Sequence, residues 1–127
     1  MKMRLPGTGV WHDDRGVAAV EFAMVAPMFI MLAVGTFYVC MCLFLTGSLH
    51  YAVEQAARCK SIKTTVCTDS ASTVTYAQNS YFGPGGTPNF TYAAAACGNQ
   101  VNATINYAWN IGIKQFTLPV SATACFP

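Results

Sequence analysis

The longest uncharged stretch of this sequence decides what the chain can fold into. No charged residue occurs over residues 22–49, and residues 22–45 are almost wholly apolar. About 20 helical residues span the roughly 30 Å hydrocarbon layer of a bilayer. The stretch therefore predicts one transmembrane helix over residues 22–46. It is too long for the apolar region of a cleaved secretory signal, so it is expected to act as a signal anchor.

The composition of the chain also indicates a membrane environment. The chain has 127 residues, of which 54% are hydrophobic and only 9% are charged. A chain of this length cannot bury so much apolar surface in its own core, because small domains bury the smallest fraction of their surface. We therefore expect membrane lipid as a partner. The formal net charge of +2, with no basic run, excludes an electrostatic nucleic-acid footprint.

The helical pattern continues beyond the apolar stretch. Small and apolar residues recur at helical spacing at Leu49, Ala52, Val53, Ala56 and Ala57. We predict one long helix over residues 17–60, with its last turns in a polar compartment.

Residues 61–127 have the composition of a small α+β domain. Thr68, Asp69 and Ser70 are helix-starting residues ahead of a pattern that predicts a short helix to about Tyr81. Three β-rich runs follow, over residues 90–96, 101–109 and 116–124, and predict a three-stranded antiparallel sheet. We expect the short helix to lie across one face of this sheet. The aromatic residues expected in the core are Tyr76, Tyr81, Phe82, Phe90, Tyr92, Tyr107, Trp109, Phe116 and Phe126.

The six cysteines fall into two groups. Cys40 and Cys42 lie in the apolar stretch and are expected to be buried, unreactive thiols. The other four, Cys59, Cys67, Cys97 and Cys125, predict two disulfides, for which sequence allows three connectivities. We favour Cys59 with Cys67 as a local clasp, and Cys97 with Cys125 joining strand ends. A four-cysteine zinc site is the alternative, although no close pair of cysteines supports it.

Disulfides also set the expected topology. The basic residues on the two sides of the apolar stretch balance, so the positive-inside rule does not decide the orientation. Disulfides form outside the cytoplasm, which places residues 61–127 on the extracytoplasmic side and the N-terminus in the cytoplasm. Asn89 and Asn102 begin triplets that match the N-glycosylation pattern, although such triplets also arise by chance in a sequence rich in Asn and Thr.

Glu21 is a carboxylate at the edge of the apolar stretch. A charged group in the bilayer costs several kcal/mol, and such residues are functional candidates by default. The alternative is an acidic residue at the start of the helix, at headgroup depth. Position alone does not separate these two roles.

The surroundings of Glu21 resemble a known family. Residues 15–27, with the sequence RGVAAVEFAMVAP, resemble the N-terminus of TadE-like minor pilins, the pseudopilin group of the Tad (Flp) subclass of type IV pili. Two more segments are similar to this family: the helix end YAVEQAARC over residues 51–59 and the C-terminus ACFP over residues 124–127.

The resemblance implies a processing step and an assembly role. It implies a cytoplasmic leader over residues 1–16, cut by a prepilin peptidase between Gly16 and Val17. Glu21 is then the fifth residue of the mature chain. The resemblance assigns Glu21 and Phe22 to subunit assembly, where the Glu21 carboxylate would neutralise the new α-amino group of a neighbouring subunit rather than that of its own chain.

Two classes of function remain at this point. The first is a structural minor pilin, inserted in the bacterial inner membrane and then taken into a pilus that serves adherence. Its implied partners are the prepilin peptidase, other pilins and the pilus assembly platform. The second is an uncleaved, membrane-anchored extracytoplasmic binding or sensor domain. No catalytic motif, cofactor loop or metal-ligand spacing is recognisable in the sequence, so we expect neither an enzyme nor a cofactor.

Overall fold

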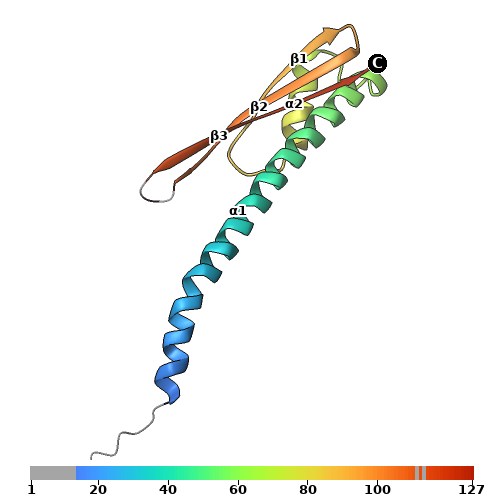
Figure 1. Ribbon diagram of the computed structural model, residues 1–127. Helices are drawn as coiled ribbons and strands as arrows, with labels where there is room; N and C mark the ends of the chain where they lie inside the picture. The colour runs from blue at the N-terminus through green and yellow to red at the C-terminus, as the bar shows by residue number, and fades with distance from the viewer. Residues whose placement is uncertain (1–13, 111, 113) are drawn as a thin grey trace, which may run out of the picture. The chain divides into compact units, whose positions relative to one another are not determined.

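The computed structural model describes residues 14–110, 112 and 114–127. Within these residues the elements are helix α1 (Asp14–Ile62), helix α2 (Ser70–Ser80) and strands β1 (Asn89–Ala95), β2 (Gly98–Asn110) and β3 (Gln115–Phe126). The chain divides into two units, residues 1–37 and residues 38–127, and α1 contributes to both (Figure 1). These elements confirm the predicted α+β fold with its long N-terminal apolar helix.

Helix α1 is slightly longer than predicted at both ends, since it was expected over residues 17–60. Pro27 lies inside it, thirteen residues after the helix begins. Proline has no backbone N–H, so the carbonyl of Ala23, four residues earlier, loses its helical partner. The rest of the segment is rich in residues that favour a helix in an apolar environment, and transmembrane helices tolerate proline better than soluble ones do.

The three strands form one antiparallel sheet in the order β1-β2-β3. Strands β1 and β3 begin and end within two residues of their predicted bounds, and β2 begins three residues earlier than predicted and ends one residue later. Strand β1 pairs with β2 only as far as Asn89 opposite Thr104, whereas β3 continues to Gln115 opposite Asn110. The β2–β3 hairpin therefore extends beyond β1 (Figure 1).

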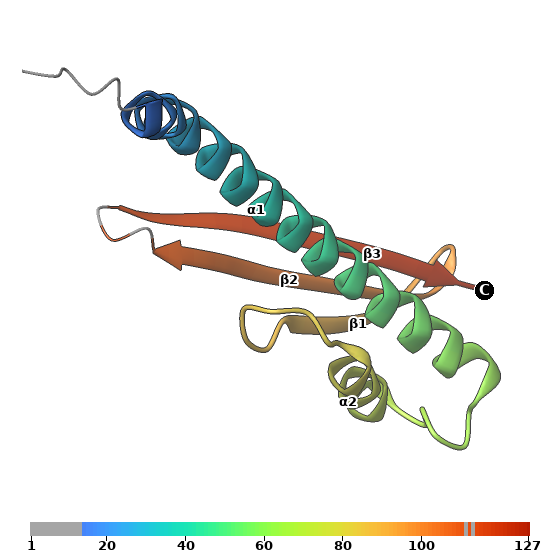
Figure 2. The ribbon, with the colours of Figure 1, turned by 90° about the horizontal axis from the view of Figure 1, so that it is seen from below.

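The core of residues 38–127 lies between one face of this sheet and the C-terminal half of α1 (Figure 2). Helix α1 contributes buried residues at helical spacing: Leu45, Leu49, Ala52, Val53, Ala56 and Ala57. The sheet contributes Phe90, Val101, Ala103, Ile105 and Ala122. The prediction that the short helix covers the sheet is wrong. Helix α2 lies beside β1 and buries only Thr73 and Ala77, because α1 has the longer apolar stripe and occupies the face.

One end of the sheet is attached to the last turns of α1 by polar contacts. The Tyr92 hydroxyl donates to Asn99 Oδ1 at 2.7 Å, and Asn99 Nδ2 donates to Ser61 Oγ at 2.8 Å. The Ser61 hydroxyl also lies 3.3 Å from each of two carbonyl oxygens to which it can donate, those of Ala57 and Phe126. Gly98 occupies the tight turn at this end with φ of 118°, and a Cβ there would collide with the backbone of Phe126.

Helix α2 begins with a capping box at Asp69. Asp69 Oδ1 accepts a hydrogen bond from the backbone N–H of Ser72 at 2.7 Å, and the Ser72 hydroxyl lies 3.0 Å from the backbone nitrogen of Asp69. The predicted helix start is therefore confirmed. The bonds from Ser72, helped by the charge of Lys60, hold the pKa of Asp69 below its usual value of 3.8.

This lowered pKa predicts a pH dependence of stability. Above the unfolded pKa the carboxylate is charged in both states and its stabilisation is fully present; below pH 3.8 that stabilisation is lost as the pH falls through the folded pKa. Asp69→Asn keeps a good cap but does not titrate. We expect the melting temperature of the wild-type chain in detergent to fall more between pH 7 and pH 3 than that of the variant. Equal falls, followed by circular dichroism, would refute the role of Asp69.

Candidate membrane and assembly segment

The first unit presents an apolar helix that its own fold leaves uncovered. Residues 16–37 are exposed, apart from half-buried Ala26. The large exposed side chains are Val17, Val20, Phe22, Met24, Val25, Met28, Phe29, Ile30, Met31, Leu32, Val34 and Phe37. Among the described residues, α1 is the one helix long and apolar enough to cross a membrane. It is therefore compatible with a membrane anchor.

Polar groups in the apolar part of α1 are satisfied within the helix. The hydroxyl of Thr36 donates to the carbonyl of Leu32 at 2.8 Å, and that of Thr46 donates to the carbonyl of Cys42 at 2.9 Å. Such bonds to the preceding turn remove the cost of placing a hydroxyl in an apolar environment. These two threonines therefore do not interrupt the apolar segment.

The expected cleavage bond lies in the first turn of α1. Gly16 and Val17 follow the first helical residue, Asp14, by two and three positions, and both are exposed. The N–H groups of a first turn have no carbonyl partner inside the helix, so this turn opens more easily than the interior. The expected leader residues 1–13 lie outside the described part of the chain.

Glu21 and Phe22 are both exposed on α1, one turn after Val17. Val17 and Glu21 are four residues apart, which is a rise of about 6 Å and a spacing at which helical side chains face each other. Glu21 thus lies one helical turn from the amino group that cleavage would create, closer than the expectation of a pairing only between subunits assumes. The spacing allows an ion pair within one chain as well as between neighbouring subunits.

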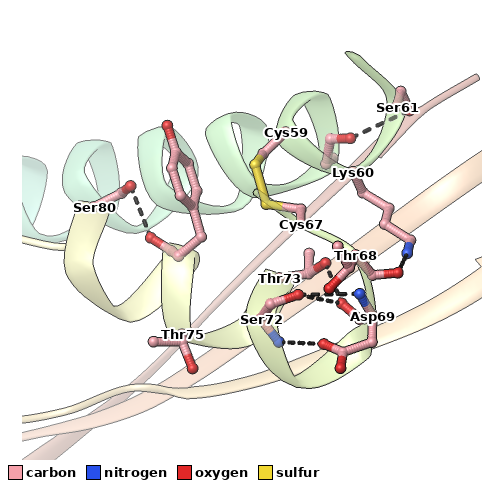
Figure 3. Close-up of a disulfide and its surroundings, with 12 residues drawn as sticks. Cys59, Lys60, Ser61, Cys67, Thr68, Asp69, Ser72, Thr73, Thr75 and Ser80 are labelled. Atoms are coloured by element: carbon pink, nitrogen blue, oxygen red, sulfur yellow. Dashed lines mark hydrogen bonds between the residues drawn. A yellow bond between two sulfur atoms is a disulfide. The ribbon is translucent and has the colours of Figure 1, made fainter. Parts of the chain in front are cut away.

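A disulfide clasp closes the connection between α1 and α2 (Figure 3). Cys59 and Cys67 are bonded, and both are buried. Next to them, Lys60 Nζ donates to the carbonyl of Thr68 at 2.7 Å, immediately ahead of the Asp69 cap (Figure 3). The clasp therefore fixes where α2 begins relative to the end of α1.

The second disulfide joins Cys97, in the β1–β2 turn, to Cys125 near the end of β3. Both bonds are the pairs favoured above among the three connectivities. Because all four sulfur atoms are bonded in pairs, the zinc-site alternative is contradicted.

The remaining cysteines differ from expectation. Cys40 is exposed and Cys42 is half-buried, and both are free thiols. They were expected to be buried, but the apolar residues of this part of α1 face outward instead of into the fold. Two aromatic residues outside α1 also differ from expectation. Phe82 and Phe116 were predicted in the core and are 59% and 43% exposed.

Two of the three segments that resemble TadE-like proteins come together in the second unit. The Arg58 guanidinium lies 5.6 Å from the centre of the Phe126 ring. Around this pair, Glu54, Ala57 and the end of β3 line a shallow cleft of about 300 Å³. The helix end over residues 51–59 thus packs against the C-terminal segment over residues 124–127.

Comparison with protein families gives one match. Residues 16–58 match the sequence model of a family described as TadE-like protein. This segment is TadE-like. The match begins at Gly16 and ends at Arg58, so it includes Val17, Glu21 and Phe22 as well as the helix that supplies the core of the second unit. No curated protein and no solved structure matches the chain.

The match covers most of α1 and none of the strands, so the likeness is carried by this helix. Either a membrane or a protein assembly would cover the apolar surface that the helix leaves exposed in the single chain.

Proposed function

We propose that this protein is a minor pilin, or pseudopilin, of a Tad-type pilus. Before assembly, residues 22–46 of the helix hold it in the bacterial inner membrane, with the leader over residues 1–16 in the cytoplasm and residues 61–127 in the periplasm. A prepilin peptidase cuts between Gly16 and Val17. The mature chain, whose helix covers residues 17–60, then joins the pilus through the assembly platform and takes part in its initiation or in forming its tip for adherence.

The observation that carries this proposal is the TadE-like match beginning at Gly16. Three features of the structure support it. The proposed cleavage bond lies in the easily opened first turn, Glu21 is placed one turn further on, and the apolar surface that follows is exposed in the single chain. An uncleaved sensor domain would need the anchor, but it would not need a small residue before Val17 or a carboxylate at position 21.

Cleavage distinguishes the pilin from the uncleaved domain. We expect the chain extracted from membranes of cells with the peptidase to begin at Val17. Its mass should be lower by about 1.7 kDa, which is the 13.6 kDa chain mass scaled to 16 of 127 residues. Gly16→Leu should leave the full mass, because the peptidase needs a small residue at the cut.

The matched control is Gly35→Leu, which makes the same change inside the helix, where no atom lies within 4 Å of the added Cβ. This variant should be cleaved normally. An intact Met1 in the wild-type chain, or normal cleavage of Gly16→Leu, would refute the proposed processing.

A further inference from the structure

The far end of the β2–β3 hairpin carries an apolar face that the fold covers only in part, since Tyr107 and Trp109 are half-buried and Phe116 and Leu118 are exposed. Tyr107 pairs with Leu118 and Trp109 pairs with Phe116, so these four side chains share one face of the sheet. We call them the hairpin-end face. It continues the core face of β3, and exposure rises along that strand from 3% at Ala122 to 38% at Leu118 and 43% at Phe116. The apolar pattern of the strand therefore continues beyond the residues that the rest of the chain buries.

The hairpin-end face adjoins the apolar stretch of α1. The rings of Tyr38 and Trp109 meet edge to face, with centroids 4.9 Å apart, and Tyr107 packs against Trp109 at 5.9 Å. Tyr38 belongs to the uncharged stretch over residues 22–49. Seven residues later, Leu45 is fully buried in the core. Residues 38–49, the last part of the apolar stretch, thus belong to the second unit.

The length of the remaining helix matches a bilayer. Residues 17–37 number 21, which corresponds to about 32 Å of helix against roughly 30 Å of hydrocarbon. Tyr38 then falls at the outer boundary of the hydrocarbon, and Trp109 lies beside it. Residues 38–46, the end of the proposed membrane segment, would then lie in the interfacial layer of the bilayer.

The chemistry of the hairpin-end face suits that layer. Trp and Tyr are enriched at membrane interfaces, where their rings meet acyl chains and their polar atoms meet headgroups. Lys114 Nζ lies 5.7 Å from the centre of the Phe116 ring. A lysine can cover an apolar ring with its stem and hold its ammonium among anionic headgroups.

We propose that the hairpin-end face lies in the outer interfacial layer of the lipid bilayer while the chain is membrane-held. The hairpin then forms a second membrane contact of the chain. The occupant is lipid, because Trp109 packs on Tyr38, which directly follows the exposed apolar residues 17–37 along the chain. The proposal rests on the anchor in the proposed function and is independent of pilus assembly.

Quenching of tryptophan fluorescence tests this contact. The chain has two tryptophans, Trp11 and Trp109, so Trp11→Phe leaves Trp109 as the reporter. The full-length variant is placed in vesicles of phosphatidylethanolamine and phosphatidylglycerol, with or without bromine at the middle of the acyl chains. We expect brominated lipid to lower the emission of Trp109 relative to the unbrominated lipid, because an interfacial indole ring meets the acyl chains.

Two matched variants, both with Trp11→Phe and Trp109→Phe, separate the possible outcomes. Met28→Trp reports on the anchor and should be quenched. Ile62→Trp, about 36 Å further along α1 than Tyr38, should not be quenched. If position 28 is quenched and Trp109 is not, the hairpin contact is refuted and the anchor stands. If neither is quenched, the anchor itself is wrong. Quenching at position 62 would mean nonspecific contact of the whole unit and would also refute the hairpin contact.

Discussion

Glu21→Gln is expected to remove the protein from sheared pili while leaving leader cleavage unchanged. Cleavage creates an α-amino cation at Val17, and packing this end into apolar surroundings requires a neutralising carboxylate. An unpaired charge there costs several kcal/mol, and each 1.4 kcal/mol is a factor of ten in an equilibrium constant. We therefore expect the amount of the variant in the pilus fraction, measured by quantitative mass spectrometry, to fall about tenfold or more.

Glu54→Gln is the matched control for this experiment. Glu54 is an exposed carboxylate on the same helix, and it lies in the second unit, far along the sequence from Val17. The control should enter pili at the wild-type level. Wild-type amounts of Glu21→Gln in pili would contradict the role given to Glu21, whether its partner is the amine of its own chain or of a neighbour.

Replacing both Cys97 and Cys125 by serine is expected to cause the largest loss of stability. The bond spans 28 residues, and the chain-entropy relation gives about 3.6 kcal/mol for a loop of that length. The same relation gives about 2.5 kcal/mol for the 8-residue clasp between Cys59 and Cys67. Cys97 is exposed and Cys125 is half-buried, so serine disturbs little besides the bond.

Urea unfolding in a non-ionic detergent measures this loss, with Trp109 as the fluorescent reporter in the Trp11→Phe background. The control replaces Cys40 and Cys42 by serine, since both are free thiols. That control should unfold near the wild-type urea concentration. If the Cys97 and Cys125 double variant also unfolded there, the disulfide would not stabilise the sheet.

Most of the fold could be predicted because its signals are local. Helix α1 follows from an uncharged stretch too long for any other element, and α2 follows from the cap at Asp69. The strands follow from β-rich runs separated by glycine-containing turns. What could not be predicted is which apolar residues the chain covers itself. Phe82 and Phe90 were both expected in the core because they are aromatic, yet only Phe90 is buried.

The candidate site was predicted in a different way. Glu21 was singled out as a carboxylate at the edge of the apolar stretch, Gly16 and Val17 were identified by resemblance, and the family match covers all three positions. The structure of a single chain leaves them exposed. In the proposed function, lipid or other subunits would surround them. The hairpin-end face escaped sequence analysis for a further reason. Its residues alternate like any core strand, and only the register of β2 with β3 shows that they lie beyond the covered part of the sheet.

The central claim is that this chain is processed at Gly16 and carried into a pilus. The most direct measurement is the intact mass of the chain recovered from purified pili. We predict a chain that begins at Val17, lighter than the 13.6 kDa precursor by about 1.7 kDa, the share of 16 leader residues in 127. A chain that is absent from pili and keeps its full mass in the membrane would contradict the account.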